Sequence, residues 1–133
     1  GLNETDLQRV VINFPEVLSR DVNKILRPNL AYLKSSGIDY GQIAALVAGY
    51  PPVLIKSITN SLGPRINFLV NVMGRRIDEI ADYPDFFRHG LKKRLELRHK
   101  LLQERNIHCS LSEMLDCNQK KFLSKFCLVE QLA

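Results

Sequence analysis

Basic side chains are concentrated between Arg88 and Arg105. This segment contains seven Lys or Arg residues and two Glu residues, an excess equal to the net charge of +5 of the whole chain. A field concentrated on one segment attracts a polyanion more strongly than the same charge spread evenly. The segment therefore predicts phosphate binding, and the residues that we expect to carry it are Arg88, Lys92, Lys93, Arg94, Arg98, Lys100 and Arg105.

Three further arginines, Arg65, Arg75 and Arg76, are weaker candidates for the same role. Cations on exposed helix faces also keep a helical protein soluble, and we prefer that explanation for a second set: Arg9, Arg20, Lys120, Lys121 and Lys125. Contacts between cations and phosphates position a nucleic acid without reading its sequence. The charge pattern thus predicts a binding surface and no base specificity.

The residues that could support catalysis or bind a metal are poorly arranged for either. The histidines have no carboxylates at metal-binding spacing, and the glycines form no phosphate-binding loop. The acidic residues Asp78, Glu79 and Asp82 fit the first turn of a helix, where the helix dipole favours them. We therefore predict no enzyme, cofactor, metal or small-molecule substrate.

The three cysteines, Cys109, Cys117 and Cys127, are an odd number without a two-residue spacing. This pattern argues against a disulfide framework and a zinc site, and for a reducing compartment. Cys127 has no base nearby in sequence and is expected to be a small buried apolar residue.

The elements that must position the basic segment are arranged as an internal repeat. An aromatic-proline pair occurs at Pro15, Pro51 and Pro84, which are 36 and 33 residues apart. A second marker, at Pro28, Pro64 and Leu97, recurs at the same two intervals of 36 and 33 residues. Two markers with one set of intervals indicate stacked supersecondary units. We expect repeat units at about 1–37, 38–74 and 75–106, with a cap over 107–133 that closes the array.

Local signals place helices throughout these units and no strand anywhere, so the predicted class is all-α. Asp39 with Gln42, and Ser110 with Glu113, have the spacing of capping boxes, and Asn118 can cap a last helix. Asn60 or Ser61 can cap the helix that Pro64 opens. Loss of proline at Leu97 lets one helix run from about Leu91 to about Arg105.

The aromatic residues of the first marker, Phe14, Tyr50 and Tyr83, are interpreted as core wedges. Stacking on nucleic-acid bases is the alternative for the two tyrosines.

With 133 residues and 45% apolar content, the chain can form one continuous core, and no apolar run is long enough to span a membrane. The start at Gly1 suggests a piece of a longer protein without a recognisable transit peptide.

These motifs resemble the mitochondrial transcription termination factor (mTERF) family of organellar proteins, and plant members in particular. The resemblance lies in residues 14–18, 28–33, 50–54 and 64–69, and in the closing stretches 95–105, 110–115 and 121–126. It departs from the family at Leu97, where proline is common. It implies three helices per repeat, stacked in a right- or left-handed superhelical solenoid whose concave basic side holds nucleic acid.

The same resemblance implies a location in mitochondria or chloroplasts, and a role in transcription termination, initiation, splicing or ribosome assembly. The expected partner is nucleic acid, either double-stranded DNA or structured RNA. The alternative is a helical-repeat module that grips an acidic organellar protein, and an enzyme fragment is a distant third. A shared position in the repeat places Arg65 and Arg98 on one side of the stack.

Overall fold

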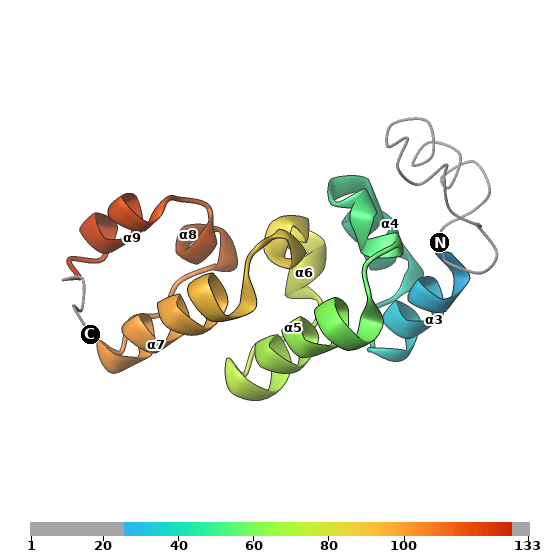
Figure 1. The fold of residues 1–133 in the computed structure, drawn as a ribbon, viewed down its shortest axis with the longest axis horizontal. Helices are drawn as coiled ribbons and strands as arrows, with labels where there is room; N and C mark the ends of the chain where they lie inside the picture. The colour runs from blue at the N-terminus through green and yellow to red at the C-terminus, as the bar shows by residue number, and fades with distance from the viewer. Residues whose placement is uncertain (1–25, 129–133) are drawn as a thin grey trace. The chain divides into compact units, whose positions relative to one another are not determined.

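The computed structural model describes residues 26–128, and every regular element within that range is helical (Figure 1). This confirms the all-α class for the part of the chain described. The expectations for the first repeat unit before residue 26, including the Phe14-Pro15 turn, lie outside the described residues. The chain divides into two compact units, one ending at Phe87 and the other beginning at Arg88.

The first unit is built from short helices joined by tight turns. Their bounds are α3 (Arg27–Ser35), α4 (Tyr40–Gly49), η2 (Pro51–Leu54), η3 (Ile58–Leu62), α5 (Gly63–Asn67), η4 (Phe68–Val72) and α6 (Glu79–Asp82). The predicted stripe of Ile43, Leu46 and Val47 on α4 is buried. Burial of this apolar face, more than helix propensity, stabilises elements as short as these.

Buried Asn29 on α3 adds a polar contact to this core. Its side-chain amide donates to the backbone oxygens of Val53 and Lys56, at 2.9 Å each, and so attaches α3 to the turn around η2. A buried amide needs such partners because an unsatisfied polar group is costly away from water.

The two described copies of the aromatic-proline turn have the same backbone geometry. Tyr50 has φ −145° and ψ 75°, and Tyr83 has φ −137° and ψ 74°. Each precedes a tight helical turn, η2 after Tyr50 and η5 (Pro84–Arg88) after Tyr83. The restriction that a proline imposes on the residue before it explains why both tyrosines leave the helical region. Tyr50 is buried, as expected of a core wedge, and Tyr83 is half-buried.

The predicted caps at Asp39, Ser110 and Asn118 are present. Asp39 accepts from the Gln42 amide at 2.8 Å and Ser110 from the Glu113 amide at 3.1 Å, each with the reciprocal bond of a capping box. Asn118 accepts from the Lys121 amide at 2.8 Å. Backbone and side-chain hydrogen bonds from Ser110 hold the pKa of Glu113 below its ordinary value.

The helix that contains Pro64 begins earlier than predicted. Its cap is Ser57, which accepts from the Asn60 amide at 3.0 Å, and not Asn60 or Ser61. The chain then runs as a wide helical turn from Ile58 to Leu62 before α5. Proline clashes with the carbonyl four residues earlier in a regular α-helix, and a wider turn relieves that clash. The sequence reasoning placed Pro64 at the helix start, whereas the wide turn lets it lie inside.

The second unit consists of η6 (Leu91–Glu96), α7 (Leu97–Glu104), α8 (Leu111–Leu115) and α9 (Gln119–Lys125). Helical dihedrals at Glu96 and Leu97 join η6 and α7 without a break, which confirms the predicted long helix. Leu95 and Leu102 are buried on it, and Leu91 is half-buried.

Arg98 lies on this buried face and is fully inaccessible to solvent, with 0% exposure. Its Nη1 atom donates to the Met114 backbone oxygen at 2.9 Å. Its guanidinium carbon lies 4.7 Å from the centre of the Phe122 ring, a cation–π distance. The prediction that Arg98 contacts nucleic acid is therefore wrong, because its charged group is enclosed by α8 and α9. Arg98 follows Leu95 by three residues and precedes Leu102 by four, and this helical spacing indicates that Arg98 lies on the apolar face.

Gly49 is a position where the first unit has no room for a side chain. A Cβ there would lie 2.5 Å from Cγ of Pro84. We expect Gly49→Ala to lower the free energy of unfolding by about 1–3 kcal/mol, because the proline ring and its backbone must shift. Urea denaturation measures this change. In the control, Gly90→Ala, the added Cβ meets nothing within 4 Å. Equal stability of both variants would contradict the close packing of α4 against Pro84.

Arg98 provides a second test of packing. We expect Arg98→Ala to lower the free energy of unfolding by about 3 kcal/mol, since it removes a buried hydrogen bond and leaves a cavity. The matched control is Arg105→Ala, at the exposed C-cap residue of the same helix, for which a change within about 0.5 kcal/mol is expected. Unfolding followed by circular dichroism compares the two. An Arg98→Ala protein as stable as the parent would show that Arg98 is not a core residue.

Candidate nucleic-acid interface

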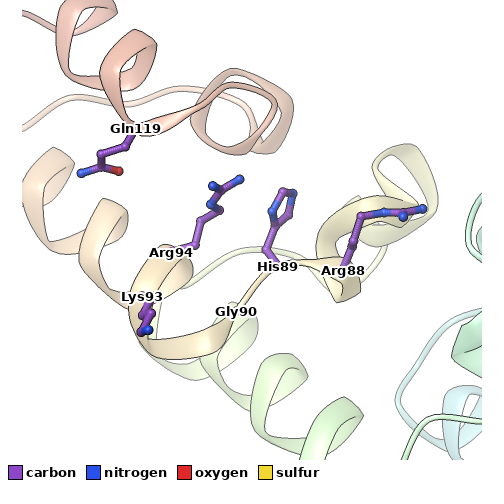
Figure 2. Close-up of a pocket in the computed structure, with 6 residues that line it drawn as sticks. All are labelled: Arg88, His89, Gly90, Lys93, Arg94 and Gln119. Carbon is purple, nitrogen blue, oxygen red and sulfur yellow. The ribbon is translucent and has the colours of Figure 1, made fainter.

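A basic pocket lies within the second unit, at the start of its long helix. Its volume is about 580 Å³, and its lining residues are Arg88, His89, Gly90, Lys93, Arg94 and Gln119. Figure 2 shows Arg94 and His89 extending from the start of η6 toward the segment that carries Gln119. Arg88 and Lys93 point away from this centre and form its rim (Figure 2). No carboxylate lines the pocket.

Several local features hold these side chains in place. Gly90 precedes η6 in an extended conformation, with φ −66° and ψ 134°, so the helix starts at the edge of the pocket. The Asn118 cap starts α9 one residue before Gln119. Because Arg98 joins α7 to α8 and α9 one turn beyond Arg94, it also sets the spacing between Arg94 and Gln119. The pocket therefore depends on the core beneath it.

The cations of this segment are available to a ligand. Lys92, Lys93, Lys100 and Arg105 are exposed and Arg94 is half-exposed. Within residues 26–128, no hydrogen bond or ion pair engages these five side chains. Unpaired like charges repel one another, and an anionic ligand relieves that repulsion. The electrostatics of the segment thus favour a phosphate-bearing ligand.

The three weaker candidates lie in the first unit and have partners there. Arg75 pairs with Glu79 at 2.9 Å, and Arg76 with Asp78 at 2.8 Å. Arg65 donates to the Ser61 carbonyl at 3.1 Å and is half-buried, whereas Arg98 is fully buried. A shared repeat position therefore does not give Arg65 and Arg98 the same environment. Carboxylate partners reduce the attraction that Arg75 and Arg76 offer to a phosphate.

Two residues of the pocket were not among the predicted contacts. His89 was considered only as a metal ligand, although its place beside Arg88 in the basic segment is a signal for phosphate binding. Gln119 comes from the closing segment of the chain, and no local pattern connects it with Arg94. Only the fold brings these two residues to one site.

The described residues hold no cluster for metal chemistry. No group of three or more His, Cys, Asp or Glu side chains within residues 26–128 is arranged to hold a metal ion. Within the described residues, Cys109, Cys117 and Cys127 form no disulfide. Cys127 is exposed, so the expectation that it is buried is wrong; it adopts a positive φ of 55° directly after α9. None of the described helices is both long and apolar enough to cross a bilayer.

Comparison with known proteins places these features in a family. The mTERF family profile matches residues 1–123. Transcription termination factor MTERF6, chloroplastic/mitochondrial, of Arabidopsis thaliana is 66% identical over 62 residues, which are 47% of this chain and 19% of that protein. Transcription termination factor MTERF2, chloroplastic, of the same plant is 29% identical over 122 residues, or 92% of this chain and 19% of that protein.

A third relative, Transcription termination factor MTERF4, chloroplastic, of Arabidopsis thaliana, is 29% identical over 121 residues and 22% of its own length. The chain thus spans about a fifth of the length of the curated relatives that it matches. Their names assign them to the chloroplast, or to chloroplast and mitochondrion, and bear out the expected organellar localisation. Because the family profile covers nearly all of this sequence, the chain belongs to the mTERF family.

Proposed function

We propose that this chain is the nucleic-acid-binding part of an organellar regulator of transcription termination or of a related step in gene expression. The observation that carries the proposal is a set of five solvent-accessible cations for which no ion pair is found within residues 26–128, namely Lys92, Lys93, Arg94, Lys100 and Arg105. The names of the family relatives, all transcription termination factors, support the process. Double-stranded DNA or structured RNA is the ligand that this charge favours.

The residues that we assign to phosphate binding are those of the basic segment other than Arg98. Lys92, Lys93 and Arg94 lie at the start of the helix, where the dipole adds partial positive charge. Lys100 and Arg105 extend the charged surface along the helix, and Arg88 lies on the other rim of the pocket. Arg65, Arg75 and Arg76 stay secondary candidates, because each has a partner in the first unit. No catalytic residue, metal or cofactor is part of the proposal.

We also propose that the repeat units of this chain stack as a solenoid. The common geometry at Tyr50 and Tyr83 supports repeat units that stack as a superhelical solenoid, with units at about 1–37, 38–74 and 75–106 and a cap over 107–133. In such a stack, one repeated position becomes a row along one side. A row of cations would follow a phosphate backbone.

A second candidate function is binding of an acidic organellar protein. The observation that favours it is a set of exposed apolar side chains in the first unit, Tyr40, Val70 and Val72, which are 55%, 38% and 53% exposed. Tyr40 is the first residue of α4, and the two valines lie on η4; exposed apolar side chains are a feature of protein contact surfaces. Failure to bind nucleic acid, together with capture of an acidic protein from an organelle extract, would favour this function.

The salt dependence of binding tests the main proposal. The affinity of the chain for duplex DNA and for structured RNA is measured by fluorescence anisotropy across a salt series. We expect replacement of Lys92, Lys93 and Arg94 together by Gln to reduce the slope of log affinity against log salt by up to about 2.7 for a DNA duplex, since each lost phosphate contact removes about 0.9.

The matched control replaces Lys34, Lys56 and Lys121 by Gln, which makes the same change in net charge at exposed lysines outside the segment. It should leave the slope nearly unchanged. Equal slopes for the two triple variants would show that the basic segment is not the contact surface. Circular dichroism establishes that each variant is folded.

A further inference from the structure

The shape of the basic pocket indicates a more specific ligand than a phosphodiester backbone. Its volume of about 580 Å³ lies in the range of sites that enclose a small molecule or a single nucleotide. A backbone that follows a helix surface needs only a row of cations, whereas an open hollow can receive a single group that approaches from solvent. The donors of this hollow come from two separate segments, Arg94 and His89 on one side and Gln119 of α9 on the other (Figure 2).

The charge of the pocket matches a group with more than one negative charge. Arg94 extends into the pocket, Arg88 and Lys93 on the rim add positive potential, and His89 and Gln119 complete the polar lining. A phosphate monoester has a charge of about −1.5 to −2 at neutral pH and three strong acceptor oxygens. A phosphodiester within a strand has one negative charge and two free oxygens. The monoester therefore gains more from the positive potential of the rim and from a hydrogen bond with Arg94, since hydrogen bonds between charged groups are the stronger ones.

We infer that this pocket binds a phosphate monoester, either the terminal phosphate of a nucleic-acid strand or the phosphate of a free nucleotide. This inference rests on the proposed function, because it uses the same basic surface. It adds a ligand class: within one nucleic acid, the end is held more tightly than the interior. Arg94 and His89 bind the phosphate from the helix side, and the Gln119 amide donates to it from α9.

The experiment compares three strands of one sequence with an internal fluorophore. One has a 5′-phosphate, one a 3′-phosphate, and one has hydroxyl groups at both ends. At pH 7.5 and fixed salt, we expect at least one phosphorylated strand to bind the full chain about tenfold more tightly than the hydroxyl strand, or about 1.4 kcal/mol. Nucleoside 5′-monophosphate and nucleoside 3′-monophosphate, each added as a competitor, distinguish the two sources. If a monophosphate displaces the strand at a concentration near the dissociation constant of that monophosphate, the site binds free nucleotides. If neither monophosphate displaces the strand, the site recognises strand ends.

Gln119→Glu is the decisive variant, because it has the same shape and places a negative charge opposite Arg94. It should remove the preference for the phosphorylated strand. At the first position of α9 an acidic residue suits the helix dipole, so the variant is expected to fold. The matched control is Gln103→Glu, an exposed residue of α7 outside the pocket, which should keep the preference.

The outcomes separate this inference from the proposed function. Equal affinity for the three strands, with salt-dependent binding and no competition by either monophosphate, would overturn the monoester site and leave nucleic-acid binding in place. Absence of binding to all three strands, and also to the duplex DNA and the structured RNA of the salt series, would overturn the proposed function. In that case direct calorimetry with the two monophosphates decides the pocket: binding that Gln119→Glu removes supports the site, and no binding refutes it.

Discussion

The second unit depends on the burial of one arginine. The guanidinium of Arg98 donates to the Met114 carbonyl of α8, lies 3.7 Å from the Cys117 sulfur and covers the Phe122 ring of α9, all from a helix whose other buried residues are leucines. A charged group enters a core only where such partners replace water, because an uncompensated buried charge is very costly. Once in place, those partners restrict how α8 and α9 can lie against the long helix. The basic pocket forms at that junction, between Arg94 and Gln119.

The arginines of this chain therefore have different structural roles. Arg98 holds helices together, Arg75 and Arg76 pair with nearby carboxylates, and Arg94 borders an open hollow. Their intrinsic chemistry is the same, and the difference lies in the solvent access and partners that each position allows. A stretch of seven cations is thus not one binding surface. Arg98 stabilises the core, whereas Lys92, Lys93, Arg94, Lys100 and Arg105 are accessible to solvent and have no ion pair within residues 26–128.

Asn29 and Arg98 are polar side chains buried in the two units, and each links its helix to a later element of the same unit. Asn29 donates to the backbone oxygens of Val53 and Lys56, and Arg98 donates to that of Met114. Arg65, which follows Pro64, is half-buried and donates to the earlier Ser61 carbonyl instead. The pocket, in contrast, uses Gln119 from the closing segment, after the last expected repeat.

The sequence by itself determined whatever depends on neighbours along the chain. The capping boxes at Asp39 and Ser110, the break before Pro51 and Pro84 and the unbroken helix after Leu91 all follow from contacts within a few residues, so local pattern was enough to predict them. The burial of Arg98 and the placement of Arg94 and Gln119 on one pocket were decided by tertiary structure. The reason is physical: whether a cation stays in water depends on which distant groups enclose it, and no spacing within one segment specifies those groups.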